Sequence, residues 1–216
     1  MDFDAARLNM VNGQLLTNRV TDERLVSVIG ELPREAFLPE GRQALAYCDE
    51  DVAIGDGRYL MEPMVLAQLI QEARPAESDV ALVIGCASGY AAAVLGRLVS
   101  TVVALESDAK LAQRASDNLA SLGIDNVAVV EGALEAGYAK QGPYDVIFID
   151  GGVAKVPDSV CDQLAEGGRL VAVERSGAIG RGVIVGCFQG HVTRRECFDA
   201  AVPVLPGFEA PAEFAF

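Results

Sequence analysis

One stretch near the middle of the chain limits most strongly what the chain can fold into. Residues 81–90 read Ala-Leu-Val-Ile-Gly-Cys-Ala-Ser-Gly-Tyr, and an apolar helical pattern follows as far as Val99. A continuous apolar run predicts a buried parallel strand. Gly85 and Gly89 let the backbone turn sharply and approach a ligand, and the amides that open the next helix point toward that ligand. The stretch predicts the first strand, phosphate-type loop and first helix of a nucleotide-binding α/β sheet. An ordinary strand-to-helix turn is the alternative.

A carboxylate further along the chain favours the nucleotide-binding interpretation. Residues 101–106 form a second apolar run, which ends in Glu106 about 20 residues after Gly85, and folds of this kind place an acid on ribose hydroxyls at that spacing. Glu106 is therefore the best candidate for binding a cofactor. The alternative is a solvated strand end beside the helix that starts at Ser107.

Charge and composition exclude several classes of protein. The 216-residue chain has a formal charge of -14 and no cluster of Lys and Arg, which argues against a nucleic-acid partner. It has no run of 18 apolar residues, and its first residues are not a basic, apolar leader, so we expect a soluble, cytoplasmic protein that does not enter a membrane.

Five scattered cysteines without a CxxC pair indicate reduced thiols that pack in the fold. His191 is the single histidine and lies in an expected turn, so no His-rich metal site is expected.

Helical spacing predicts that two helices precede the sheet. The first covers about residues 4–16, and the second begins near residue 20 with Thr21 as its N-cap. Prolines bracket residues 33–39, which predicts a short turn or a single helical turn, and Pro63 marks the start of a further helix that ends near Pro75. We expect one domain over 1–216, in which an N-terminal helical cap and substrate-side segment (1–75) covers a cofactor-binding sheet (76–216).

Later apolar runs predict the rest of a mostly parallel sheet. Strands are expected at residues 127–132, 144–150 and 168–173, with a helix over 156–164. Two short runs, 182–188 and about 193–198, flank a Gln-Gly-His turn and predict a terminal antiparallel hairpin. The tail from Pro203, which contains Phe208, Phe214 and Phe216, is expected to be irregular coil on the surface.

Three motifs in this order resemble the protein-L-isoaspartate O-methyltransferase family. The family pattern runs approximately PRexFvP, then AYxDxxLPIGxGQTISqP, then VLEIGTGSGYqAAVL, and residues 33–39, 46–63 and 81–95 follow it with the same order and spacing. The resemblance covers about residues 8 to 175. It implies a Rossmann-like methyltransferase fold, S-adenosylmethionine as the cofactor, and the carboxylate of an isoaspartyl residue in a peptide or protein as the methyl acceptor. The cofactor contacts that it implies are Gly85, Ala87, Gly89, Tyr90, Glu106, Ser107, Gly132 and Ala133.

The chain departs from the family at several polar positions. Met61 stands at the serine that the family directs at its substrate, and a thioether neither donates a hydrogen bond nor accepts one well. Val83 replaces the acid before the first glycine, Ala87 the middle glycine, and Ala133 the aspartate that reaches the adenine. The substrate-side candidates are Met61, Tyr59 and Arg58. We expect Arg58 either to contact a substrate carboxylate or to be a surface arginine paired with Asp56 or Glu62.

Three functions remain open from the sequence. The first is a methyltransferase that acts on isoaspartyl or related carboxylates and needs no general base, because a carboxylate is already deprotonated near neutral pH. The second is a divergent member that binds the cofactor or a partner and has little or no activity on isoaspartyl peptides. The third is a nicotinamide-dependent oxidoreductase, which leaves the N-terminal motifs unexplained.

Asp150 matches a magnesium ligand of catechol-type O-methyltransferases, but too few oxygen ligands lie near it in the sequence, so no metal is expected. The oligomeric state stays open.

Overall fold

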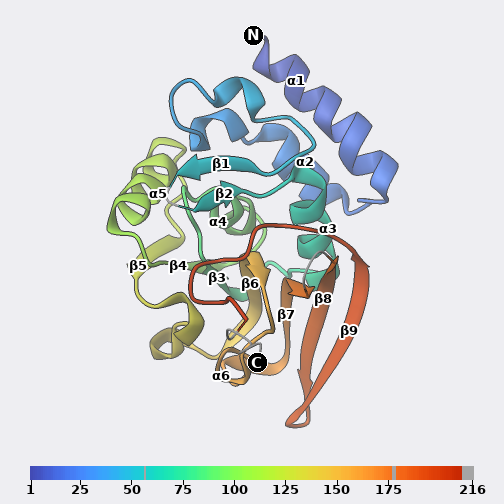
Figure 1. Cartoon of the computed structure of the whole chain (residues 1–216), viewed down its shortest axis with the longest axis vertical. Helices are drawn as coiled ribbons and strands as arrows, with labels where there is room; N and C mark the ends of the chain where they lie inside the picture. Colours follow the sequence, from blue (N-terminus) through green and yellow to red (C-terminus); the bar gives the residue numbers. More distant parts are fainter. Residues whose placement is uncertain (56, 177–178, 211–216) are drawn as a thin grey trace, which may run out of the picture.

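A seven-stranded sheet forms the centre of the molecule (Figure 1) in a computed structural model that describes residues 1–55, 57–176 and 179–210. The strand order is β5-β4-β3-β6-β7-β8-β9. The five parallel strands are β3 (Val80–Ile84), β4 (Thr101–Glu106), β5 (Val127–Glu131), β6 (Tyr144–Val153) and β7 (Leu164–Ser176). The antiparallel strands β8 (Ile179–Phe188) and β9 (His191–Asp199) complete the sheet. The predicted mostly parallel sheet with a terminal antiparallel hairpin is confirmed.

Two apolar layers cover the two faces of the sheet. The residues of β3 alternate between them: Ala81 and Val83 pack with the first layer, and Leu82 and Ile84 with the second. The first layer contains α3 (Pro63–Ala73), α4 (Tyr90–Gly96) and α5 (Ala109–Ser121), and the second contains the short helix α6 (Asp158–Cys161). Because β3 is covered on both faces, it is apolar along its whole length.

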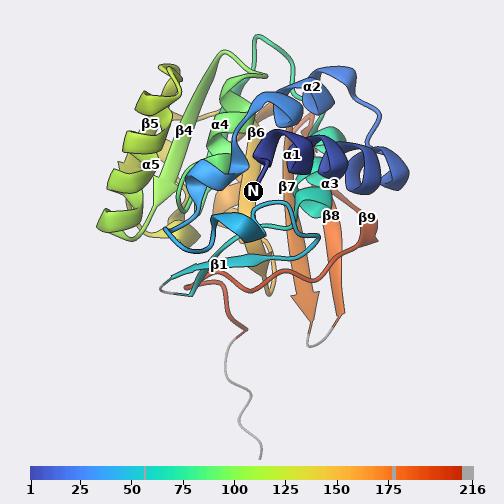
Figure 2. The same cartoon turned by 90° about the horizontal axis from the view of Figure 1, so that it is seen from above.

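The N-terminal segment lies on the side of the first layer (Figure 2). Helix α1 (Phe3–Met10) continues into a π-helical turn and a 3₁₀ turn over residues 11–18, and α2 (Glu23–Glu31) follows. The side chain of Asp22 accepts a hydrogen bond from the amide of Leu25 at 3.1 Å, so Asp22 is the N-cap and the prediction of Thr21 is wrong. Residues 34–37 form the expected single turn of helix.

A two-stranded hairpin connects this segment to α3. Strands β1 (Val52–Gly55) and β2 (Arg58–Leu60) pair with each other and form a sheet separate from the large one. No strand was expected here from the sequence. Successive side chains of a strand point to opposite faces, so Arg58 and Leu60 are buried whereas Tyr59 is 36% exposed.

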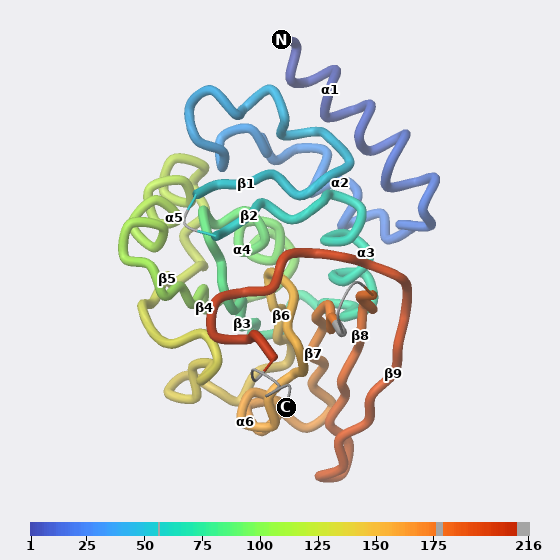
Figure 3. The backbone as a smooth tube through the Cα atoms, in the orientation of Figure 1, coloured from blue at the N-terminus to red at the C-terminus, as the bar shows by residue number. Residues whose placement is uncertain are grey.

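Two expectations for the C-terminal half are wrong. The helix predicted over 156–164 is only α6, because Tyr144 of β6 already donates its amide to the carbonyl of Gln163 at 2.8 Å and the chain continues as β7. The segment 202–208 is not surface coil, since Val202, Leu205 and Phe208 are buried. Figure 3 shows this segment crossing back over the sheet from β9 toward β3. Phe214 and Phe216 lie outside the described residues.

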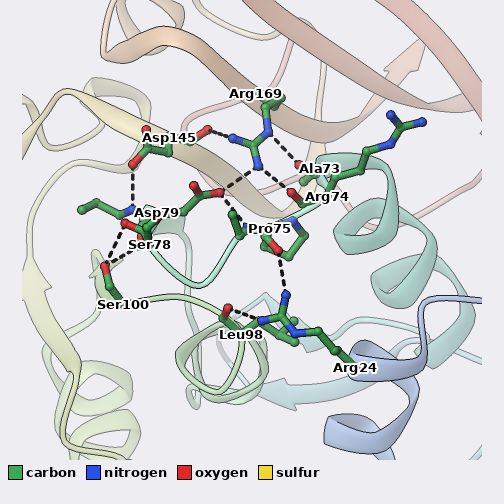
Figure 4. Close-up of polar contacts among 12 residues, drawn as sticks. Arg24, Ala73, Arg74, Pro75, Ser78, Asp79, Leu98, Ser100, Asp145 and Arg169 are labelled. Atoms are coloured by element: carbon green, nitrogen blue, oxygen red, sulfur yellow. Dashed lines mark hydrogen bonds and ion pairs between the residues drawn. The ribbon is translucent and has the colours of Figure 1, made fainter.

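A cluster of polar contacts lies at the amino end of β3, the end of the strand away from Gly85 (Figure 4). The Arg169 guanidinium donates to the carbonyls of Ala73 and Arg74, each at 2.7 Å, and to a carboxylate oxygen of Asp79 at 2.8 Å. The Asp145 side chain accepts the amide of Val80 at 2.8 Å. These bonds join the end of α3 to β3, β6 and β7.

Within the described residues, no helix combines the length and apolar character needed to cross a membrane.

Candidate functional site

The turn after β3 has the backbone geometry that the sequence predicts. Gly85, Ala87 and Gly89 all have positive φ angles, of 79°, 50° and 97°. Gly89 is also packed closely, because a Cβ atom there would lie 3.2 Å from the Cβ of Ala115 in α5. Ala87 adopts the left-handed conformation at the position where the family pattern has glycine, so the turn is retained with a less suitable residue.

Glu106 lies directly against this turn, at the carboxyl end of β4. Its side chain is fully buried. Oε2 accepts the amide of Ala87 at 2.7 Å, and Oε1 accepts the amides of Ser107 at 2.8 Å and Asp108 at 3.2 Å. The alternative of a solvated strand end is therefore wrong. The structure brings the glycine turn and the acid together, as the sequence predicts, and the ribose contact itself stays a prediction.

Arg58 occupies the space in front of Glu106. Its Nη1 donates to Oε1 of Glu106 at 2.7 Å, and its Nη2 donates to the carbonyl of Gly85 at 2.7 Å. Only 3% of Arg58 is exposed, so the expectation of a surface arginine paired with Glu62 is wrong; Asp56 lies outside the described residues. Arg58 reaches this place because β2 directs it inward.

Leu205 closes the same space from the C-terminal segment. A Cβ atom built on Gly85 would lie 2.9 Å from Nη2 of Arg58 and 3.0 Å from Cδ1 of Leu205. The backbone around Leu205 is held to β6, since the amide of Leu205 donates to the carbonyl of Gly152 and the amide of Gly152 donates to the carbonyl of Pro203, both at 2.8 Å. The sequence did not predict that this segment contributes to the site. The apolar residues Val202, Leu205 and Phe208 were the available signal.

The predicted substrate-side residues line what remains of a cavity. Tyr59 and Met61 face Asp51, Asp150 and the segment 202–205 across a space of about 10 Å³, which is no more than one water molecule occupies. A site for a ligand as large as a nucleoside needs several hundred Å³, on the order of 300 or more. In this conformation Arg58 and Leu205 also occupy the space at Glu106 and Gly85 where the ribose contact is predicted, so the residues leave no room for S-adenosylmethionine.

Two acidic groups at or near this cavity, Asp150 and Glu62, have raised pKa values. Burial raises the pKa of Asp150 to about 7, against the opposing effect of the Arg58 and Arg34 guanidinium groups. Its Oδ1 atom has no hydrogen-bond partner among the described residues. Burial, reinforced by the neighbouring carboxylates of Asp49 and Asp51, raises the pKa of Glu62 to about 7.

Arg34 supports the residues beneath the cavity. It is fully buried, donates to the carbonyl of Ala46 at 2.6 Å and to the carbonyl of Met61, and stacks over the ring of Tyr90 at 4.8 Å from the centroid. The Met61 side chain is itself only 3% exposed. Tyr90 is therefore held in the protein interior, next to the turn but against Arg34.

The remaining candidates gather near the carboxyl ends of β4 and β5. Gly132 donates its amide to the carbonyl of Glu106 at 3.0 Å, and the Ser107 hydroxyl lies 3.4 Å from Oε1 of Glu106. Ser107 and Ala133 are exposed, whereas Leu134 is buried. This edge therefore presents no aspartate at position 133 for an adenine amino group. In the part of the chain that the structure describes, no group of three His, Cys, Asp or Glu residues is placed to hold a metal ion.

Comparison with known proteins connects this geometry to one family. The family model described as "Protein-L-isoaspartate(D-aspartate) O-methyltransferase (PCMT)" matches residues 7–178. A protein-L-isoaspartate O-methyltransferase of Pelotomaculum thermopropionicum is 39% identical over 166 residues, which are 77% of this chain and 72% of the relative. A protein-L-isoaspartate O-methyltransferase 1 of Rhodopseudomonas palustris is 40% identical over 169 residues, 78% of this chain and 69% of the relative.

Solved structures agree with this result. A protein-L-isoaspartate O-methyltransferase superposes with a TM-score of 0.81 at 26% identity, and the match covers 93% of this chain and 66% of that one. A putative protein-L-isoaspartate O-methyltransferase from Plasmodium falciparum, solved in complex with S-adenosyl-L-homocysteine, gives a TM-score of 0.76 at 18% identity and covers 95% and 98% of the two chains. The predicted methyltransferase fold is confirmed, and S-adenosylmethionine is the cofactor of the family. The chain belongs to the protein-L-isoaspartate(D-aspartate) O-methyltransferase family.

Proposed function

We propose that this protein is an S-adenosylmethionine-dependent carboxyl methyltransferase that acts on isoaspartyl residues of proteins, from a conformation more open than the one described. Membership of the family supports the reaction class. The observation that carries the proposal is the buried Glu106 carboxylate, bonded to the Ala87 amide of the glycine turn, because a strand-end acid beside such a turn is the arrangement that binds a ribose.

The proposed reaction requires no general base from the residues on the substrate side. A carboxylate is deprotonated near neutral pH and needs no base, so the cavity has only to orient it and exclude water. The exposed Tyr59 and the buried Met61 and Asp150 supply that surface. When bound, S-adenosylmethionine supplies the methyl group.

A second candidate function is binding without methyl transfer. The Arg58–Glu106 ion pair favours it, because the acid proposed to hold the ribose is already bonded to the chain's own cation. Met61 favours it too, because it has no hydroxyl at the position where the family uses a serine.

We also propose the setting in which the protein acts. Its partner is a protein or peptide carboxylate, and the formal charge of -14 argues against nucleic acid. We propose that residues 1–216 form one cytoplasmic domain, in which 1–75 lie on the substrate side of the sheet formed by 76–216.

A methyl-transfer assay with two peptides of the same sequence tests the proposal. One peptide carries isoaspartate and the other ordinary aspartate, and base-labile methyl esters are counted with labelled S-adenosylmethionine. Ester on the isoaspartyl peptide alone supports the proposed function. Binding of S-adenosylhomocysteine without ester on either peptide supports the second candidate. Binding of NAD in place of both nucleosides would require the oxidoreductase interpretation.

A further inference from the structure

We infer that Arg58 and Leu205 together form an intramolecular plug of the cofactor site, which keeps the resting protein closed to nucleosides until both residues move. The inference rests on the proposed function in one respect: it takes Glu106 as the acid that binds the ribose. We define the plug as Arg58 of β2 together with the segment 202–205.

Arg58 meets the hydrogen-bonding needs of the site that it fills. Nη1 donates to Oε1 of Glu106 and Nη2 to the carbonyl of Gly85, both at 2.7 Å. Ribose hydroxyls bind a strand-end carboxylate by the same kind of donation. A guanidinium group adds a full charge and a second bond in a fixed planar geometry. A nucleoside must therefore compete with a charged group for the same carboxylate.

Leu205 lies against the same glycine turn as the guanidinium. Its side chain approaches the faces of both Gly85 and Gly151, since Cβ atoms built there would lie 3.0 Å from Cδ1 and 2.5 Å from Cγ of Leu205. Leu205 is 4% exposed. Its contact with Gly85 places it directly over the turn where the cofactor is expected, so removing Arg58 alone does not clear the site.

Both parts of the plug are attached to elements that can move without breaking the large sheet. Arg58 belongs to β2, which pairs only with β1 among the described strands. The segment 202–205 joins β6 through two backbone bonds with Gly152, which together make the isolated bridge between Gly152 and Val204, and the Val202 carbonyl accepts a bond from Nη1 of Arg175 at 3.3 Å. Opening therefore breaks an ion pair, these local bonds and the packing of the buried Leu205, but no strand pairing within the large sheet has to break.

A closed resting state lowers the measured affinity in proportion to the fraction of open molecules. Substitutions that destabilise the plug should therefore tighten nucleoside binding even though they remove protein contacts. A residue that merely supported the fold would have the opposite effect.

Isothermal titration of S-adenosylhomocysteine into four variants and the wild type tests the inference. Arg58→Gln removes the cation and places at position 58 the residue of the family pattern; we expect it to bind at least about tenfold more tightly than the wild type. Arg58→Lys keeps the charge but replaces the planar fork of donors with a single nitrogen, so an intermediate gain is expected. Leu205→Ala keeps the ion pair and should give a gain in affinity of severalfold.

Arg42→Gln is the matched control, because Arg42 is an exposed arginine that bonds to the Ala53 carbonyl in the neighbouring β1. The affinity of this variant should equal that of the wild type.

Equal affinity of the wild type, Arg58→Lys and Leu205→Ala would overturn the inference, and this comparison holds even if Arg58→Gln does not fold. Absence of binding in every variant would overturn it as well.

The methyl-transfer assay separates the plug from the proposed function. Tighter binding by the variants without any methyl ester leaves the plug supported and rejects the proposed function. Ester formation with no gain in affinity supports the proposed function and rejects the plug.

Discussion

The guanidinium of Arg58 and the carboxylate of Glu106 meet at 2.7 Å in the protein interior, where 3% of the first residue and none of the second is exposed. Breaking a buried ion pair by removing one partner leaves an uncompensated charge. This pair joins a hairpin of the substrate-side segment to the end of a central strand. It therefore couples the stability of the fold to the state of the candidate site.

Arg58→Gln is expected to lower the free energy of unfolding by ~3 kcal/mol, because Glu106 then keeps its backbone amide donors and the Ser107 hydroxyl but loses its cation. Urea denaturation at pH 7 measures the change. Arg169→Gln is a suitable comparison, since Arg169 forms an ion pair with Asp79 at the far end of the sheet. It should also destabilise the protein, but without tightening nucleoside binding. A change below about 0.5 kcal/mol for Arg58→Gln, the size of a surface substitution, would contradict the assignment of a buried pair.

The pH dependence of stability should reveal the buried Asp150. Its pKa is about 7 in the folded protein and 3.8 in an unfolded chain, so the folded state binds the proton more tightly. The stability contributed by this group is fully present below about pH 4 and is lost as the pH rises through 7. Asp150→Asn does not titrate. Between pH 4 and pH 8 the variant should therefore gain ~4 kcal/mol relative to the wild type. Urea titrations at both values measure this, and parallel pH profiles would show that Asp150 is not perturbed.

Ala87→Gly is expected to stabilise the protein by about 0.5 to 1 kcal/mol. Ala87 has a φ angle of 50°, which costs a residue with a Cβ atom about 1 to 2 kcal/mol, and the greater freedom of glycine in the unfolded chain offsets part of the gain. Thermal unfolding should show a higher midpoint for the variant. A lower midpoint would indicate that the Ala87 methyl group contributes packing that outweighs the backbone cost.

Met61→Ser should raise methyl transfer to an isoaspartyl peptide at least about tenfold over Met61→Ala, if the proposed function is right. Both substitutions remove the same buried thioether and should cost about 2 to 4 kcal/mol of stability, so the difference between them isolates the hydroxyl. The measurement is kcat/KM for ester formation. Equal values for the two variants would show that the hydroxyl of the family serine has no role in this chain.

The sequence predicted the parts of the fold that depend on local pattern. The strands from β3 to β7 and the turn at Gly85 follow from continuous apolar runs and small residues. Proline at position 63 predicted the start of α3. The spacing of Glu106 from Gly85 in the sequence predicted that this acid lies beside the turn, and its bond to the Ala87 amide agrees.

The wrong predictions for Arg58 and Leu205 concern contacts between segments far apart in the sequence. Arg58 and Glu106 are 48 residues apart, and the residue type at position 58 does not reveal that β2 turns it inward. Leu205 looked like surface coil because it lies in a stretch with proline and glycine, yet it is buried against Gly85 and Gly151. The N-cap error at Thr21 is a local one, since Asp22 is equally good in sequence and only its bond to Leu25 decides.

A crystal structure of Arg58→Gln with S-adenosylhomocysteine tests the central claim most directly, namely that Glu106 is a ribose-binding acid covered by the chain's own arginine. We predict the two ribose hydroxyls on the Glu106 carboxylate, one of them where Nη1 of Arg58 lies in the wild type, with Leu205 withdrawn from Gly85. A crevice that stays filled at saturating nucleoside, or a nucleoside bound without contact to Glu106, would contradict the account.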